Sequence, residues 1–307
     1  MSKSGHSAVK EFGILLRDTF KSWNSRDPFT VSTTIAYYTI FSLPGLLVII
    51  INLAGYFFGV DAVTNQITTQ IGGMIGTNTA SDIQDIIAKA SETKGTTLAS
   101  ILGIATLLFG ATGVFYQLQQ ILNKIWEVEP KTDQRILELV KDRVFSFGLI
   151  LVIGFLLLVS LVLSAGLSAL SSWVSIHFSE SLTLFFKILD ILLSLGVVTV
   201  LFASIYKFLP DAKINWRDVW IGALVTAILF VITKFALGIY FSKSNPGTAY
   251  GAAGTIILIM LWVSYSGLIL LFGAEFTRVH SRKKGVLKPK PTKVARSTGR
   301  HPLPKPA

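Results

Sequence analysis

The sequence predicts an all-α, polytopic membrane protein with six transmembrane helices, and three observations support this fold class. Apolar residues make up 51% of the 307 residues and charged residues only 15%, whereas an average soluble domain has about 25% charged residues. The apolar residues gather in long runs, and Lys and Arg are distributed unevenly between these runs. Because a soluble protein of this composition would expose large apolar patches, we expect lipid to cover much of the surface.

Each apolar run is long enough, or nearly long enough, to form one membrane-spanning helix. A hydrocarbon core of roughly 30 Å requires about 20 apolar residues in a helix. The runs are continuous rather than alternating, which favours helices over the strands of a membrane barrel. The predicted spans are 33–58, 96–122, 144–170, 187–208, 219–241 and 252–276, which together form a transmembrane domain over 31–277.

The distribution of Lys and Arg predicts the orientation of these spans. If both termini are cytoplasmic, 23 of the 28 Lys and Arg residues lie in cytoplasmic segments. Cytoplasmic loops of membrane proteins carry an excess of these residues, so we predict that both termini lie in the cytoplasm. The basic, Pro-rich tail at 278–307 is predicted to be disordered and to lie over anionic lipid headgroups. It has no aromatic residue for base stacking, so nucleic acid is not a predicted partner.

Three connecting segments are predicted to contain additional helices. The cytoplasmic segment 1–30 has apolar residues at helical spacing, which predicts an amphipathic helix that lies in the membrane interface or packs against the bundle. We expect short helices in the external loop 61–95, opened by Ser81 or Asp82, and in the cytoplasmic loop 123–143. The predicted apolar face of the external helix consists of Ile83, Ile86, Ile87 and Ala90.

A serine repeat in the third predicted span indicates helix packing. Ser160, Ser164 and Ser168 recur every four residues. Small residues at this spacing let two membrane helices approach closely, and their hydroxyls can bond across the interface. We therefore predict a packing face; the wall of a hydrophilic path is the alternative.

Ionisable residues within the predicted spans are candidates for a functional site, because a charge inside a bilayer is costly. Lys187 and Asp190 lie at the start of the fourth span, and Lys234 lies toward the outer end of the fifth. Asp190 could pair with Lys234 across the two helices, or with Lys187 while Lys234 extends outward to water. The sequence leaves both arrangements open.

Glu275 lies near the predicted cytoplasmic end of the last span, where the helix dipole disfavours an anion. Either Arg278, at i+3, offsets its charge, or Glu275 points inward and binds a basic group from another helix. With Lys187, Asp190 and Lys234 it forms the predicted lining or gate of a membrane cavity. Further polar lining is predicted from Asn52, Gln117, Gln120, Asn123, Tyr37 and Tyr38.

Several kinds of chemistry are excluded or disfavoured by the sequence. Without cysteine, disulfides and thiolate metal sites are excluded. The four histidines lie far apart, and neither HExxH nor GxxxxGK[ST] occurs. We predict no metal, no cofactor and no catalytic residues, and therefore a protein that is not an enzyme.

Four segments of the chain resemble the YihY/BrkB family of bacterial integral membrane proteins. They are DPFTVSTTIAYYTIFSLPGLL at 27–47, GATGVFYQLQQILNKIWEVEP at 110–130, YKFLPDAKINWRDVWIGALVTA at 206–227 and AYGAAGTIILIMLWVSYSGLILLFGAEF at 249–276. The resemblance covers about residues 20–284. The FLP turn and the terminal GAE make the last two segments the most specific.

The resemblance implies a six-helix protein of the bacterial inner membrane with both termini cytoplasmic, and it implies no set of catalytic residues. Relatives have carried the label ribonuclease BN, which looks like a misassignment, and some are suspected of moving lipids. The leading hypothesis is therefore a transporter or flippase for a lipid or other amphiphile, and a non-transporting scaffold or partner-binding protein of the cell envelope is the alternative. A ribonuclease is disfavoured because the cytoplasmic carboxylates are dispersed among basic residues.

Overall fold

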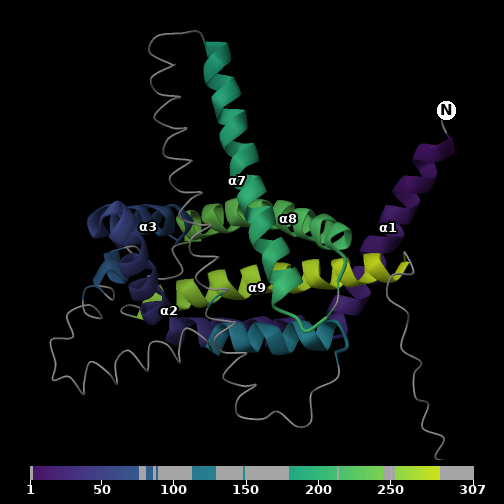
Figure 1. The fold of residues 1–307 in the computed structure, drawn as a ribbon, viewed down its shortest axis with the longest axis horizontal. Helices are drawn as coiled ribbons and strands as arrows, with labels where there is room; N and C mark the ends of the chain where they lie inside the picture. Colours follow the sequence, from purple (N-terminus) through teal and green to yellow (C-terminus); the bar gives the residue numbers. More distant parts are fainter. Residues whose placement is uncertain are drawn as a thin grey trace, which may run out of the picture.

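The computed structural model describes residues 3–75, 81–85, 88, 113–128, 148, 180–212, 214–244, 250 and 253–283. Within these ranges the regular secondary structure is helical (Figure 1), so the all-α class is confirmed for the described part of the chain. The helices are α1 (Lys3–Asn24), α2 (Pro28–Phe58), α3 (Val60–Ile75), α7 (Glu180–Phe208), α8 (Trp216–Ser244) and α9 (Gly254–Lys283), and residues 113–125 form a further helix.

Three described helices contain stretches that are long and apolar enough to cross a membrane. These stretches are Ile191–Phe208 in α7, Trp216–Phe241 in α8 and Gly254–Lys283 in α9. They agree with the last three predicted spans.

Two other predicted spans cannot be compared with the structure in the same way. Most of 96–122 and nearly all of 144–170 lie outside the described residues, and so does the serine repeat Ser160, Ser164 and Ser168. The number of six spans therefore stays a prediction.

α9 lies at the centre of the described helices. It packs against α1, α2 and α8, and Figure 1 shows it running between α8 and α2. Two clusters of buried apolar side chains follow its length. The first includes Leu122, Tyr206 and Leu271, and the second includes Ile83 and Leu258. Three neighbours thus depend on one helix for their packing.

α8 and α9 approach each other through two reciprocal contacts between a glycine and a threonine. A Cβ atom added at Gly222 of α8 would lie 1.7 Å from Oγ1 of Thr277 in α9. Conversely, a Cβ atom at Gly273 of α9 would lie 1.8 Å from Oγ1 of Thr226 in α8. Small residues spaced four apart allow such close packing between membrane helices.

Tyr206 fixes α7 to the same contact. Its side chain is fully buried, and its hydroxyl donates to the carbonyl oxygen of Leu270 in α9 at 2.8 Å. The hydroxyl also lies 3.0 Å from Oγ1 of Thr226 in α8. One buried hydroxyl therefore joins three helices, which is the arrangement that satisfies a polar group away from water.

The structure corrects the prediction for the loop at 61–95. α3 occupies the first part of this segment, where the sequence predicts a loop. α2 ends at Phe58, and the next residue is Gly59, whose φ of 86° lies in the left-handed region that favours glycine. α3 begins directly after it, at Val60. The first predicted span ends at residue 58, as α2 does, but the polar residues that follow, such as Asp61, Asn65 and Gln66, form no apolar run from which α3 could be predicted.

The predicted external helix is present in the part that the structure describes. Residues 81–85 are helical, and Ile83 is buried in the second cluster. The hydroxyl of Thr255, at the start of α9, donates to the carboxylate of Asp82. Ile86, Ile87 and Ala90 lie outside the described residues.

α9 is longer than the predicted last span, and this corrects the expected environment of Glu275. The helix continues past residue 276 to Lys283, so Glu275 lies about two turns before its end. The last turn instead contains His280, Arg282 and Lys283, cationic or ionisable groups that the helix dipole favours there. The dipole therefore places little cost on Glu275.

α1 packs against α9 through its C-terminal half, which is one of the two arrangements left open by the sequence. Leu15 and Thr19 are buried, and the ring of Phe12 lies 6.4 Å from that of Phe276. Phe20, by contrast, is 57% exposed. The apolar residues of α1 thus divide between a packed face and a face open to the surroundings.

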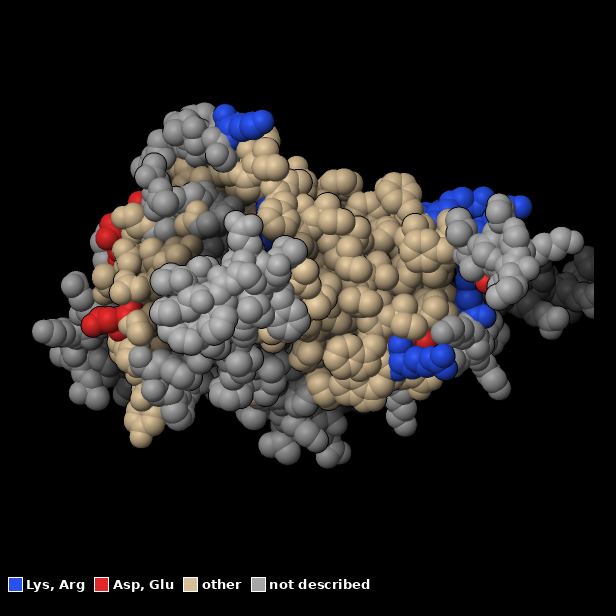
Figure 2. Space-filling view, turned by 90° about the horizontal axis from the view of Figure 1, so that it is seen from above, with Lys and Arg blue, Asp and Glu red and all other residues tan. Residues whose placement is uncertain are grey.

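Lys and Arg gather at one end of the described structure, which we name the basic end. Here α1 and α9 end and α2 begins (Figure 1). Figure 2 shows the blue Lys and Arg concentrated at this end, beyond a broad tan surface with few charges. The residues whose ion pairs lie there are Arg26, Glu127, Glu275, Arg278, Arg282 and Lys283.

The α8–α9 contact yields a stability prediction. Gly273→Ala should destabilise the protein by about 1–3 kcal/mol, because the new methyl group overpacks Thr226 and Tyr206. Gly238→Ala is the matched control, since nothing lies within 4 Å of its Cβ position. Melting temperatures of both variants in one detergent provide the measurement. Equal melting temperatures for the two variants would contradict the close contact.

Candidate functional site

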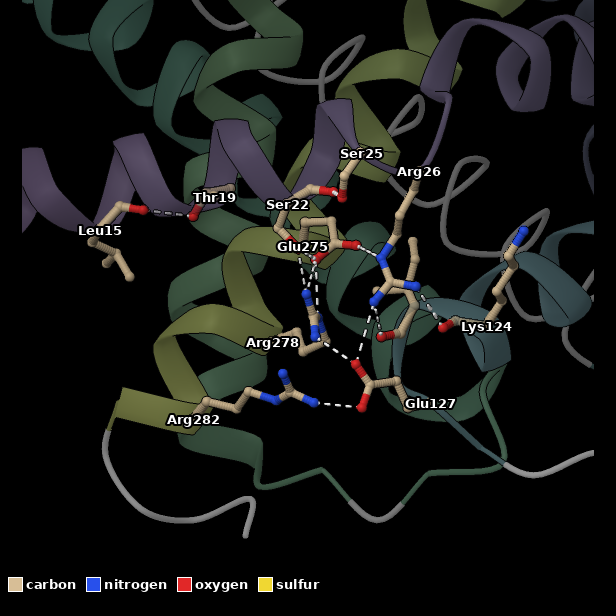
Figure 3. Close-up of polar contacts among 11 residues, drawn as sticks. Leu15, Thr19, Ser22, Ser25, Arg26, Lys124, Glu127, Glu275, Arg278 and Arg282 are labelled. Carbon is tan, nitrogen blue, oxygen red and sulfur yellow. Dashed lines mark hydrogen bonds and ion pairs between the residues drawn. The ribbon is translucent and has the colours of Figure 1, made fainter. Parts of the chain in front are cut away.

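An ion-pair network at the basic end joins three segments that are far apart in the sequence (Figure 3). Arg26 lies in the short connection between α1 and α2, and Glu127 follows the helix at 113–125. α9 contributes Glu275, Arg278 and Arg282, which recur at i, i+3 and i+7 and therefore share one helix face. The network thus fixes the α1–α2 connection, the helix at 113–125 and α9 to one another.

Glu275 is the most buried member of the network, with 1% of its side chain exposed. Its Oε2 accepts from Nε of Arg278 at 2.9 Å and lies 2.8 Å from Nη2 of the same residue. Ser22 of α1 donates to the same oxygen at 3.1 Å. The other oxygen, Oε1, forms an ion pair with Nε of Arg26. Both contacts considered from the sequence, to Arg278 and to a basic group of another segment, are therefore present together.

Glu127 is the second anion of the network and contacts three arginines. Its Oε1 lies 3.0 Å from Nη1 of Arg278 and 3.5 Å from Nη2 of Arg26. Its Oε2 lies 2.6 Å from Nη2 of Arg282. The side chain is 41% exposed, so solvent weakens these pairs relative to those of Glu275.

Arg26 also binds the end of the helix at 113–125 directly. Its Nη1 donates to the carbonyl oxygen of Lys124 at 2.9 Å, and its Nη2 donates to that of Ile125 at 3.4 Å. Carbonyl groups in the last turn of a helix lack partners within the helix. The guanidinium therefore caps this helix while it neutralises Glu275.

Two residues beside the network adopt left-handed backbone conformations. Asp27 has φ 52° and Glu127 has φ 56°, and these are the non-glycine residues with positive φ in the described ranges. Around Glu127, the N–H of Val128 donates to the carbonyl oxygen of Asn123 at 2.9 Å, and the N–H of Glu127 donates to that of Lys124 at 3.3 Å. This is the Schellman arrangement, in which glycine is usual at the position of Glu127. A side chain kept there despite the backbone cost suggests that the carboxylate is needed.

A cavity of about 750 Å³ opens beside the network. It lies between the α1–α2 connection, the helix at 113–125, the turn after α7 and α9. Its charged and polar lining consists of Arg26, Gln117, Gln119, Gln120, Asn123, Lys124, Glu127, Asp211 and Glu275. Its apolar and aromatic lining includes Trp23, Val31, Tyr116, Ile121, Ile125, Val128 and Leu271. One cavity thus presents both kinds of surface.

Asp211 anchors the polar wall of this cavity. Its Oδ2 accepts from Nδ2 of Asn123 at 2.9 Å and from Nε2 of Gln119 at 3.4 Å. Its backbone N–H donates to Oδ1 of Asn123 at 2.7 Å. Asn123 therefore bonds to both the side chain and the backbone of Asp211, which holds the turn after α7 against the helix at 113–125.

The structure brings together four of the residues singled out from the sequence. Gln117, Gln120, Asn123 and Glu275 all line the cavity. Tyr37 and Tyr38 do not; they lie with Phe29 at a shallow depression on the outer face of α2. Lys234 lies in α8 and forms no ion pair or hydrogen bond with another described residue.

Three further predicted site residues have backbone positions but no described side chains. Asn52 lies in α2, and Lys187 and Asp190 lie in α7. The two pairings considered for Asp190 thus fall outside the described residues. Among the residues that are described, no group of three or more His, Asp or Glu side chains could hold a metal ion.

Sequence reasoning missed Arg26, Glu127, Arg282 and Asp211. Arg26 and Asp211 stand in short connections between helices, where a single charged residue gives no periodic signal. Glu127 offered a weak signal, because the helix must end before Pro130 and needs a residue in the C′ position. A charged residue at that position could have indicated a specific contact.

The chain is similar to known membrane proteins along most of its length. A family model described as virulence factor BrkB matches residues 19–298. A UPF0761 membrane protein of Alteromonas mediterranea is 28% identical over 279 residues, which cover 85% of this chain and 87% of the relative. A UPF0761 membrane protein of Haemophilus influenzae is 26% identical over 273 residues, which cover 87% of this chain and 94% of the relative. No solved structure matches. The names of these relatives state no enzymatic activity.

The buried position of Glu275 predicts a large loss of stability on its neutralisation. Glu275→Gln should cost about 3 kcal/mol, because Arg26 and Arg278 lose their shared buried carboxylate. Asp18→Asn is the matched control: it removes the surface pair of Asp18 with Lys283, 3.0 Å apart, and should have little effect. Chemical unfolding of both variants in the same detergent measures the difference. Similar stabilities would show that Glu275 does not hold the network together.

The left-handed backbone of Glu127 predicts a difference between two substitutions. Glu127→Ala and Glu127→Gly both remove the three arginine contacts, but only glycine relieves the positive φ. The glycine variant should therefore be more stable than the alanine variant by about 1 kcal/mol. Unfolding midpoints provide the measurement, and an alanine variant of equal or greater stability would argue against strain at this residue.

Proposed function

The chain belongs to the virulence factor BrkB family, as the resemblance of its four segments implied, and from this premise we propose that it moves a lipid or other amphiphile across the bacterial inner membrane. The observation that carries the proposal is the cavity at the basic end, where charged and amide groups meet an apolar wall. An amphiphile has the same division, with a polar headgroup joined to an apolar tail.

The dimensions of the cavity suit such a ligand. Its lining positions on one helix run from Tyr116 to Lys124, which is about 12 Å at 1.5 Å per residue. Arg26 and Glu275 stand at the polar end, whereas Val31 and Leu271 supply apolar surface farther along α2 and α9. A headgroup at the membrane boundary could therefore enter while its tail stays beside apolar side chains.

The proposal includes an orientation. With six spans and both termini in the cytoplasm, the basic end faces the cytoplasmic leaflet, whose lipids carry negative charge. Each Lys or Arg near such a surface attracts it by about 1 kcal/mol. Anionic lipids at the cytoplasmic face are thus the proposed surroundings of the cavity mouth.

In this proposal the ion-pair network closes the inner end of the cavity. Arg26, Glu127 and Glu275 belong both to the network and to the cavity lining. Separating the helix at 113–125 from α9 would break the contacts of Glu127 with Arg278 and Arg282, which are partly exposed. Exposed ion pairs exchange for water at little cost, whereas the buried Glu275–Arg278 pair stays within α9. If Arg26 stays with Glu275 and releases the carbonyl oxygens of Lys124 and Ile125, the network opens on one side without leaving a buried charge unpaired.

A lipid-flipping assay tests the proposal. Liposomes containing the protein and phospholipids with a fluorescent headgroup are exposed to dithionite, which bleaches only the outer leaflet unless the lipids are moved. The wild type should extend bleaching to inner-leaflet lipids. Ile121→Trp, which fills the cavity, should slow this phase by about tenfold or more, equivalent to ~1.4 kcal/mol in the barrier.

Ile232→Trp is the matched control, since Ile232 lies in α8, is 59% exposed and does not line the cavity. It should bleach like the wild type. If wild-type liposomes bleach no faster than protein-free ones, with either energised or resting membranes, the protein does not move these lipids. If a glycosyl diacylglycerol with a fluorescent acyl chain gives the same result, a non-transporting role in the envelope is the better account.

A further inference from the structure

Most charged groups of the cavity already form ion pairs with one another. All three guanidinium nitrogens of Arg26 have partners: Glu275, Glu127 and the carbonyl oxygens of Lys124 and Ile125. Glu275 is bound by Arg26, Arg278 and Ser22. These two residues therefore cannot bind a phosphate or an ammonium group without first breaking the network.

The charge balance of the lining also disfavours a headgroup recognised by negative charge alone. Arg26 and Lys124 contribute two positive charges, whereas Glu127, Asp211 and Glu275 contribute three negative charges. The many Lys and Arg of the basic end thus stand around the cavity rather than within it. Attraction to an anionic membrane and recognition inside the cavity are separate properties of this end.

Apart from the exposed Lys124, the polar lining residues without a hydrogen bond or ion pair to another described side chain are amides. Gln117 and Gln120 line the cavity, and neither forms a hydrogen bond with another described residue. Oδ1 of Asp211, whose other oxygen binds Asn123 and Gln119, is a further acceptor beside them. An amide offers two donors and an acceptor side by side. Hydroxyl groups, which both donate and accept, match this set better than a phosphate, which only accepts.

The aromatic lining agrees with the same ligand class. Trp23 and Tyr116 lie among the lining residues. Nε1 of Trp23 is already engaged, because it donates to the carbonyl oxygen of Leu268 at 3.2 Å. Its ring packs against those of Phe20, Phe29 and Phe272, and the part that lines the cavity offers apolar surface that the C–H face of a saturated ring could contact.

From these observations, and resting on the proposed function, we infer that the cavity selects amphiphiles whose headgroup is a hydroxyl-rich ring, such as a sugar or a cyclic polyol. Gln117 and Gln120 hydrogen-bond to the ring hydroxyls. Leu271 and Val31 contact the apolar part of the ligand. A headgroup without hydroxyls forms fewer hydrogen bonds with these two amides.

Native mass spectrometry of the full-length protein in tetraethylene glycol monooctyl ether, a detergent without a sugar, provides the test. The probes are glucosyl dioleoylglycerol and dioleoyl phosphatidic acid, which share their acyl chains. The wild type should retain the glucosyl lipid about tenfold more strongly than phosphatidic acid. In Gln117→Leu/Gln120→Leu this preference should fall to about one, since leucine has the volume of glutamine but no amide.

Gln66→Leu in α3 is the matched control, because it removes an amide outside the cavity and should keep the wild-type preference. Melting temperatures check that each variant is folded. If the double variant is not, the single variant Gln120→Leu, at an exposed position, should still lower the preference severalfold.

Three results would overturn the inference. The first is a wild type that retains phosphatidic acid as strongly as the glucosyl lipid. The second is a folded amide variant with unchanged preference. The third is displacement of the glucosyl lipid by free glucose at an equal concentration, which would assign the cavity to a soluble sugar. Selective binding without lipid flipping would refute the proposed transport alone, and flipping without headgroup preference would refute this inference alone.

Discussion

The buried carboxylate of Glu275 is the constraint on which the basic end of this protein depends. A charge with 1% of its side chain exposed is stable only if it is paired and hydrogen-bonded. Arg278 supplies one partner from the same helix, but a second oxygen remains, and Arg26 must come from another segment to bind it. That requirement positions the α1–α2 connection against α9.

Other features of the basic end follow from this one contact. Arg26 bonds to the carbonyl groups at the end of the helix at 113–125, so the position of that helix depends on the same guanidinium. Glu127 follows in a left-handed conformation and joins Arg278 and Arg282. The cavity is the space that these segments enclose, and its polar wall is completed where Asn123 binds Asp211. Its chemistry is therefore a result of how a single buried anion is neutralised.

Hydropathy and charge distribution predicted much of the fold, because membrane helices must be long and apolar. The spans that match α7, α8 and α9 could be placed within a few residues. α3 and the extension of α9 to Lys283 could not, because the polar residues of α3, among them Asp61, Asn65 and Gln66, are typical of a loop and because α9 remains helical through the basic residues that follow Glu275. The close contact of Gly222 and Thr226 with α9 was also missed, since spaced small residues occur in most apolar runs.

The residues of the candidate site that lie on helices could be predicted from the sequence, whereas those in the connections between helices could not. Gln117, Gln120, Asn123 and Glu275 are polar residues in or beside apolar runs, and such residues stand out in a sequence. Arg26 and Asp211 come from connections, where charged residues are ordinary, and only the folded chain brings them to the cavity. The pairing of Glu275 with Arg26 in particular joins residues separated by most of the chain.

The conformation of Glu127 has an evolutionary consequence. Its backbone favours glycine while its carboxylate neutralises arginines, so the two demands on this position conflict. A lineage that loses the carboxylate gains backbone freedom and is left with a surplus cation at Arg282, whose described ion pair is with Glu127. Substitutions at positions 127 and 282 should therefore occur together, and a glycine at position 127 should accompany an uncharged residue at position 282.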